Sequence, residues 1–223
     1  MSLTEVTSTP RPASRGGGRV QEAVVTATER LLVARPLHQL SVGDIIGAAG
    51  VSRTSFYAHF GSKAAVIAEC LRRTMDLITE AVAPIHSQAG DDPEAAVRLG
   101  LQQWVEVCKE HGALLRTVSE EWPHDVELRE LWFAMLEAVT AGTAKVICEA
   151  RRSGRAPAGA DPRVLAACLT WGCERVLHVA LVGEATGLAA PDAIVEPLAQ
   201  MMIGGLYGRA LAPPRTMVNG APS

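Results

Sequence analysis

Aromatic residues are scarce in this sequence, and its cysteines form no recognisable motif. Phe, Trp and Tyr make up only 4% of the 223 residues, whereas 48% are hydrophobic, so aliphatic side chains must supply most of the core. Ala, Leu and Val abound, which favours helices. The five cysteines are scattered without a CxxC pair, which argues against a disulfide framework or a zinc site. We therefore expect no bound metal and a reducing, cytoplasmic environment.

The sequence also lacks segments for export, membrane insertion or catalysis. The first 19 residues contain no apolar run, so we expect no signal peptide. The most apolar stretch, residues 164–182, is interrupted by Glu174 and Arg175, and we expect no membrane span. No G-x-S-x-G, phosphate-binding loop, HExxH or recognisable carboxylate pair is present. The sequence therefore gives no support for an enzyme or for a cofactor.

Charge is divided unevenly along the chain, although the net charge is only −3. Residues 1–75 contain nine Lys/Arg and five Asp/Glu, whereas residues 76–223 contain twelve and nineteen. A basic N-terminal third on an acidic body suits a protein that approaches DNA with one end. Ordinary variation of surface charge would explain the same numbers, so the charge distribution alone does not indicate DNA binding.

Helical periodicity dominates the chain, and we find no strand-like alternation and no internal repeat. Residues 1–19 are polar and are predicted to form a disordered arm, as are residues 212–223 at the other end. The predicted helices span residues 20–35, 41–49, 52–59, 62–83, 92–110, 113–119, 123–154, 161–183 and 191–210. Pro36 and Pro84 are expected to end the helices that precede them.

Two short helices joined by a tight turn are predicted between residues 41 and 63. Ser41 and Asp44 have the spacing of a capping box, Gly50 favours a left-handed turn, and Ser52 caps the next helix. A small core would fix the two helices across one another: Ile45, Ala49, Val51 and Phe56. This is the helix-turn-helix arrangement, whose second helix enters a DNA major groove.

Three motifs in this stretch carry a family resemblance: Ala-Gly-Val-Ser at residues 49–52, Phe-Tyr-Ala-His-Phe at 56–60, and Ser-Lys at 62–63. Together they resemble the DNA-binding segment of TetR-family bacterial transcription regulators. The resemblance implies DNA contacts from Ser41, Ser52, Arg53, Thr54, Ser55, Tyr57, His59 and Lys63.

The resemblance also implies separate roles for these residues. Tyr57 and Lys63 would contact phosphates, although the Tyr57 ring can also pack between helices. Arg53 and Thr54 are the best candidates for base contacts, because a guanidinium group can bind guanine in a bidentate manner. Ser41 and Ser52 would act first as helix caps. His59 has a structural alternative, namely capping or packing at the end of its helix.

The C-terminal part resembles the family's helical bundle, which encloses a ligand and dimerises through its last two helices. In this chain those helices are residues 161–183 and 191–210. Small residues there permit close helix approach: Ala166, Ala167, Gly172, Gly204 and Gly205. Apolar area would come from Leu165, Leu169, Val176, Leu198, Met202 and Leu206. These faces can instead pack within one subunit, but a two-fold operator favours a homodimer through residues 161–210.

Three residue pairs extend the resemblance to the mycobacterial repressors of ethionamide activation: Leu131-Trp132, Glu174-Arg175 and Tyr207-Gly208. That resemblance implies an elongated, mostly apolar cavity for a small effector, lined by Trp104, Cys108, Trp132, Leu136, Val139, Thr143, Thr170 and Cys173. The relative carries amides where Thr170 and Cys173 align, so polar anchoring of the ligand differs here. Core packing is an equal alternative for the two tryptophans, and the spacing of Cys168, Cys173 and His178 does not suit a metal site.

We therefore predict an all-α protein of about nine helices with two domains. Residues 20–64 would form the three-helix DNA-binding domain, and residues 65–211 the bundle for ligand binding and dimerisation. The function predicted is a ligand-released repressor of a palindromic double-stranded DNA operator, located in the cytoplasm with the nucleoid. A regulator triggered by a redox-active cysteine is a variant of this hypothesis. An interaction module that has lost DNA binding is a rival, against which Tyr57 and Lys63 argue.

Overall fold

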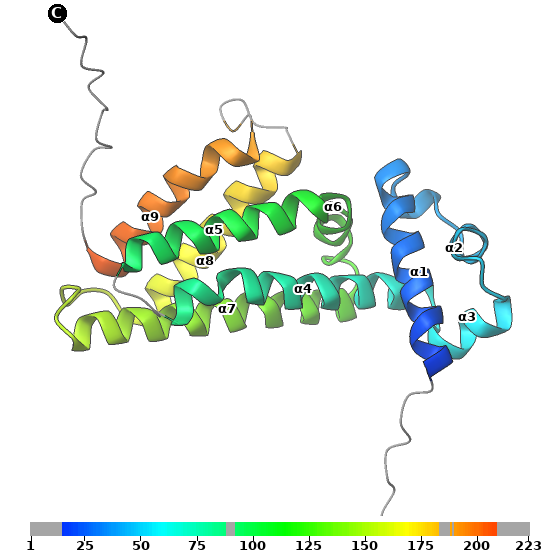
Figure 1. Cartoon of the computed structure of the whole chain (residues 1–223), viewed down its shortest axis with the longest axis horizontal. Helices are drawn as coiled ribbons and strands as arrows, with labels where there is room; N and C mark the ends of the chain where they lie inside the picture. Colours follow the sequence, from blue (N-terminus) through cyan, green and yellow to red (C-terminus); the bar gives the residue numbers. More distant parts are fainter. Residues whose placement is uncertain (1–14, 88–91, 183–187, 189, 209–223) are drawn as a thin grey trace, which may run out of the picture. The chain divides into compact units, whose positions relative to one another are not determined.

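The computed structural model describes residues 15–87, 92–182, 188 and 190–208, and every regular element within these ranges is helical (Figure 1). The elements are α1 (Arg15–Ala34), η1 (Leu37–Gln39), α2 (Val42–Ala49), α3 (Arg53–His59), α4 (Lys63–Ser87), α5 (Pro93–Glu110), α6 (Gly112–Glu121), α7 (Val126–Arg152), α8 (Pro162–Val182), η2 (Pro191–Ile194) and α9 (Val195–Tyr207). The predicted all-α class is confirmed. The predicted tail at residues 212–223 and the first 14 residues of the predicted arm lie outside the described residues.

The chain divides into two compact units, residues 1–71 and residues 72–223. The division falls inside α4, whereas the sequence placed a domain boundary at residue 64, where that helix begins. Sequence signals mark the ends of helices, but a compact unit ends where tertiary contacts end. The first two turns of α4 belong to the N-terminal unit, and Val66, Ile67 and Cys70 in these turns are fully buried.

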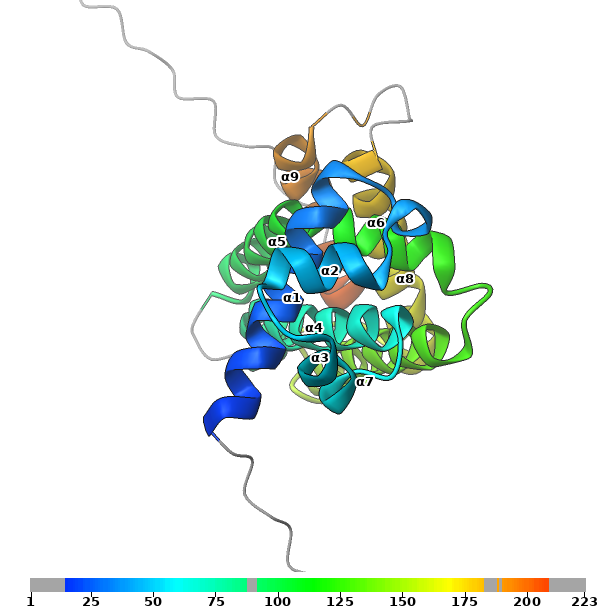
Figure 2. The same ribbon diagram turned by 90° about the vertical axis from the view of Figure 1, so that its right-hand side faces the viewer.

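In the N-terminal unit, α1 packs against both α2 and α3, and Figure 2 looks onto the unit from the side of those two short helices. Val24, Thr28 and Leu32 recur every four residues along α1 and are buried on its inner face. Ile45 of α2 and Phe56 of α3 are fully buried as well. The burial of one apolar face on each helix fixes the three helices together.

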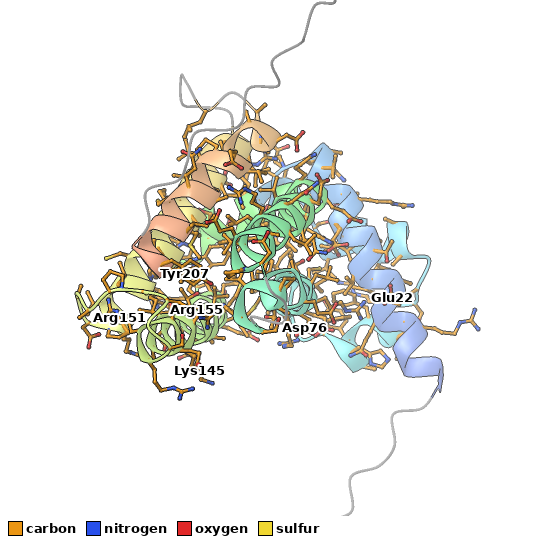
Figure 3. The ribbon with its side chains drawn as sticks, turned by 60° about the vertical axis from the view of Figure 1, so that its left-hand side comes forward. Glu22, Asp76, Lys145, Arg151, Arg155 and Tyr207 are labelled. Carbon is orange, nitrogen blue, oxygen red and sulfur yellow. The ribbon has the colours of Figure 1, made fainter. Side chains whose placement is uncertain are left out.

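In the second unit, α7 packs extensively against α8, and α5 packs against α9. Each helix contributes one buried face of mainly aliphatic side chains, which include Leu101, Leu136, Ile147, Leu177 and Ile203. The end of α9 lies against the turn that follows α7, since a β-carbon on Gly208 would lie 2.7 Å from Pro157 Cδ. Figure 3 shows Tyr207 and Arg155 at this end of the unit.

Several helix boundaries differ from the sequence prediction, among them the start of α7 at Val126 and of α9 at Val195, and two further differences have a clear physical cause. Helix α1 begins at Arg15, five residues before Val20; the three glycines at residues 16–18 disfavour a helix and carry no periodic signal. Helix α4 continues through Pro84 to Ser87, although proline removes one backbone hydrogen bond. Burial of Ile85 stabilises this last turn. Gly100 of α5 permits it, because a β-carbon there would lie 2.6 Å from Ile85 Cγ1.

Helix α7 and residues 162–181 of α8 are long and apolar enough, by length and composition alone, to cross a membrane. This finding corrects the expectation that no stretch reaches that length. The two helices pack against each other and bury their inner faces in the second unit. Core helices of globular domains have the same composition, so we interpret α7 and α8 as core helices.

Candidate DNA-binding interface and effector site

Local hydrogen bonds set the ends of α2 and α3 as the sequence predicts. The Ser41 hydroxyl accepts a hydrogen bond from the Asp44 N–H at 3.1 Å, and the Asp44 carboxylate accepts one from the Ser41 N–H at 2.8 Å. These Ser41 hydrogen bonds, with a smaller effect of Arg35, hold the pKa of the Asp44 carboxyl below its usual value. Gly50 follows with φ 64°, a left-handed conformation that glycine adopts without strain. The predicted capping box and turn are confirmed.

The recognition helix α3 has one buried side and one exposed side. The Ser52 hydroxyl caps it by accepting from the Ser55 N–H at 3.0 Å. Phe56 is fully buried, and its ring meets the Tyr57 ring edge-on at 5.3 Å and the Phe60 ring at 5.7 Å. These aromatic contacts anchor the helix, so its other side faces solvent.

The exposed side of α3 contains the polar residues expected to reach DNA. Arg53, Thr54 and His59 are exposed, and Tyr57 is 48% exposed. The Arg53 guanidinium lies 5.8 Å from the Tyr57 ring centroid, one helical turn away. The arrangement presents a guanidinium, a hydroxyl and a phenol together on one short helix, which suits contact with bases and phosphates.

Four of the predicted DNA contacts already have side-chain partners within the chain: Ser41, Ser52, Ser55 and Lys63. The hydroxyls of Ser41 and Ser52 donate to Asp44 Oδ2 and to Ser55 Oγ. Lys63, at the start of α4, donates from Nζ to the carbonyls of Leu37 at 2.7 Å and Leu40 at 2.8 Å. Because an ammonium group has three donors, one remains for a phosphate. Lys63 therefore fixes the chain before α2, a role that the sequence analysis missed.

Replacing Lys63 with methionine should lower the free energy of unfolding by about 1.5–3 kcal/mol, because charge-assisted hydrogen bonds are lost while the aliphatic stem is kept. DNA affinity should fall as well, with the salt dependence reduced by about one unit of slope. Chemical denaturation and DNA titration at several salt concentrations measure the two effects. The matched control is Lys145→Met at an exposed position of α7. Wild-type stability in Lys63→Met would contradict the structural role.

The eight residues predicted to contact an effector all lie inside the second unit. Trp104 and Cys108 come from α5, Thr170 and Cys173 come from α8, and the other four come from α7. All eight are buried. The structure therefore brings residues from three helices into one interior, which is also what core packing requires.

Some polar groups among these residues form hydrogen bonds within the second unit. Thr143 Oγ1 and His86 Nε2 of α4 form a hydrogen bond at 3.3 Å, and the Trp104 side chain hydrogen-bonds to the Cys108 thiol. Burial lowers the pKa of His86, and the positive charge of Lys145 lowers it further. Burial raises the pKa of the Cys173 thiol to about 12. A buried thiol with so high a pKa is a poor redox trigger, because the thiolate is the reactive form.

Four of the six apolar residues predicted at the dimer interface pack within the subunit, whereas Leu165 and Val176 are partly exposed. Leu169, Leu198, Met202 and Leu206 are buried in the single chain. A β-carbon on Gly205 would lie 2.8 Å from Leu169 Cδ1 and Cδ2, so α8 and α9 meet each other through this pair. A different set of α8 residues is exposed or partly exposed and recurs at i, i+4, i+7 and i+11. We define them as the α8 stripe: Val164, Cys168, Trp171 and Arg175.

The α8 stripe belongs to a larger apolar surface. Val164 is 61% exposed, and Trp171 is partly exposed, with its ring 5.5 Å from the ring of Phe133 on α7. Met201 of α9 is exposed and reaches toward Gly172 of α8, because a β-carbon there would lie 3.6 Å from Met201 Cε. An exposed apolar surface of this kind suits an interface between proteins.

Comparison with known proteins matches both units. Residues 24–70 match the family of bacterial regulatory proteins, tetR family, and residues 97–208 match the C-terminal domain of transcriptional regulator EthR. EthR of Mycolicibacterium smegmatis is 30% identical over 211 residues, which are 93% of this chain and 97% of the relative. EthR of Mycobacterium tuberculosis is 32% identical over 201 residues, which are 89% of this chain and 92% of the relative.

A solved structure supports the fold independently. A TetR-family transcriptional regulator from Mesorhizobium loti superposes with a TM-score of 0.69 at 17% identity, covering 89% of this chain and all of that chain. Members of this family are DNA-binding regulators and not enzymes, and they bind operators as dimers. With the helix-turn-helix match and relatives of 30–32% identity over most of the chain, the protein belongs to the TetR family of bacterial transcriptional regulators.

Proposed function

We propose that this regulator is a repressor that binds a palindromic operator as a homodimer and leaves it when an effector binds. The observation that carries the DNA-binding part is the exposed side of α3, where Arg53, Thr54 and Tyr57 are presented by a helix anchored through buried Phe56. Tyr57 and the free donor of Lys63 would contact phosphates, and Arg53 would contact a base. The protein would act in the cytoplasm, on the nucleoid.

The proposed dimer forms through the α8 stripe and the neighbouring surface of α9. One α3 helix contacts only a few base pairs, so a palindrome is bound specifically when two copies are joined with their recognition helices about 34 Å apart. Three members of the α8 stripe, Val164, Cys168 and Trp171, are apolar and exposed or partly exposed in the single chain, and the opposite face of α8 is already packed. Burying this surface between two copies would remove it from water.

The proposed effector is a small, mostly apolar molecule bound among the buried residues of α5, α7 and α8. His86 provides a route from this site to α4, since it hydrogen-bonds to Thr143. Helix α4 contains residues of both units, so a displacement of its C-terminal half would bias the position of the DNA-binding unit. The effector must bind the released state better than the operator-bound state, because equal affinity would shift nothing.

Replacing Arg53 with alanine should relax sequence preference at one base position, costing about 1–3 kcal/mol against the preferred operator. The operator is selected from the DNA flanking the gene, and variants at each position are compared by competition titration. Arg116→Ala, at an exposed position of α6, is the matched control. An equal loss of affinity for every sequence would contradict base contact by Arg53. If the wild-type protein binds none of the DNA fragments that flank the gene, the proposed function is contradicted.

A further inference from the structure

Two polar groups on the buried face of α8 have no hydrogen-bond partner among the residues that the structure describes. They are Thr170 Oγ1 and Glu174 Oε2, and the two residues are 2% and 5% exposed. Since they are four positions apart, they lie one turn apart on the same side of the helix. Buried polar groups are nearly always hydrogen-bonded in folded proteins, so this pair needs an explanation.

Thr170 differs from other threonines in the helices of this protein. The hydroxyls of Thr28, Thr79 and Thr117 each donate to the carbonyl four residues earlier, at 2.8, 2.9 and 2.9 Å. Thr170 has the same option at Ala166 in its own helix, yet its hydroxyl is unpartnered. The hydroxyl is therefore available to a group that is not part of the chain.

Glu174 has only weak compensation for its charge. Arg175 Nη2 lies 3.7 Å from Glu174 Oε2, beyond hydrogen-bond distance, and the arginine side chain is 55% exposed. Burial raises the pKa of Glu174, and the charge of Arg175 opposes this shift. Burying a carboxylate oxygen without a hydrogen bond costs stability, and perturbed carboxyls of this kind concentrate at functional sites.

The neighbouring helix α5, which packs against α8, carries an aromatic ring. Helix α8, which carries Glu174, packs against α5, where burial raises the pKa of the Cys108 thiol to about 12 and the charge of Glu174 adds to this shift. Cys108 is hydrogen-bonded to the Trp104 side chain, which is itself buried. A carboxylate together with an indole ring is a combination that binds organic cations, through charge and through cation–π attraction.

We propose that the effector carries a basic amine on an apolar body, and that Glu174 and Thr170 bind its ammonium group near Trp104. The inference rests on the effector-released function proposed above and names the chemistry of that site. The ammonium would donate to Glu174 Oε2 and to Thr170 Oγ1, which satisfies both orphaned oxygens. An anionic effector would be repelled by Glu174, and a neutral alcohol would add no charge to the weak compensation from Arg175.

Three probes with the same ten-carbon chain test this inference on the full-length protein: 1-decylamine, 1-decanol and decanoate. Binding is measured by tryptophan fluorescence and by the shift in melting temperature. The amine is protonated at neutral pH, so it should bind about 10- to 100-fold more tightly than the alcohol, as expected for a hydrogen bond with a charged group. Decanoate should bind most weakly.

Two variants and one control assign the preference to these side chains. Glu174→Gln keeps the shape and removes the charge, so the advantage of the amine over the alcohol should disappear. Thr170→Val should reduce the affinity for the amine. Thr117→Val is the control, because its buried hydroxyl is used within its own helix, and it should bind all three probes as the wild type does. Circular dichroism verifies that each variant is folded.

The inference is overturned if the wild type binds the alcohol or the acid as tightly as the amine, or binds none of the three. It is also overturned if Glu174→Gln keeps the preference. Operator titration with the amine present tests the proposed function separately from the amine site. If the amine binds in a Glu174-dependent way but leaves operator affinity unchanged, the amine site stands and effector release is wrong.

Discussion

Replacing Cys168 with glutamate should yield a folded monomer that binds a palindromic operator about 10²- to 10⁴-fold more weakly than the wild type, which is the gain that joining two binding modules provides. Cys168 is exposed in the middle of the α8 stripe, so the substitution should leave the single chain intact. At a two-fold interface, however, it would bury a carboxylate from each copy without a partner. Light scattering gives the oligomeric state, and operator titration gives the affinity.

The matched control for this variant is Cys148→Glu, because Cys148 is also an exposed cysteine but lies on α7, outside the stripe. Thiol labelling provides a second test with the wild type alone. Cys168 should react slowly in the dimer, whereas Cys148 should react as a free surface thiol. A dimeric Cys168→Glu variant, or equal labelling of the two cysteines, would place the interface elsewhere.

Replacing Phe56 with alanine should cost about 3–5 kcal/mol of stability, the range for truncation of a buried phenylalanine. The ring is fully buried and contacts the rings of Tyr57 and Phe60, so its loss leaves a cavity behind the recognition helix. Operator binding should be lost. Because the second unit has a core of its own, we expect hydrogen exchange to increase in α1, α2 and α3 and to stay slow in α7 and α8.

The neighbouring variant Tyr57→Phe separates folding from DNA contact. It removes one hydroxyl from a half-exposed ring and keeps the ring contact with Arg53, so stability should change by less than about 0.5 kcal/mol. Affinity should fall for specific and unrelated DNA alike, since phosphate contacts carry no sequence information. Unchanged affinity would mean that the hydroxyl does not contact phosphate. A Phe56→Ala variant as stable as Tyr57→Phe would contradict the anchoring role of Phe56.

The helix-turn-helix segment is the part of the molecule that could be predicted most completely from the sequence. Its boundaries depend on groups within a few positions of one another: the Ser41–Asp44 capping box, the left-handed Gly50, and the Ser52 cap. Such signals are local, so they act in the same way in any surrounding fold. Once Phe56 is predicted to be buried, the helical period also predicts which side of α3 is exposed. The effector residues came from resemblance and not from local chemistry.

The sequence was less informative wherever a residue's partner is distant in the chain. Lys63 was predicted to contact a phosphate because of its charge and its place in the motif. The carbonyl groups that accept its hydrogen bonds lie 23 and 26 positions away in the sequence. Leu169 and Leu206 looked like interface residues because they are apolar. Their burial within the subunit depends on how α8 packs against α9.

The sequence by itself therefore determined the helical class, the family and the position of the DNA-binding helix, because periodicity, caps and spaced motifs are encoded over short distances. Only the tertiary structure decided which face of α8 is exposed, that α4 continues through Pro84, and that Thr170 and Glu174 are buried without partners. Burial and hydrogen-bond satisfaction are sums over neighbours from several helices, and no single segment of the chain specifies them.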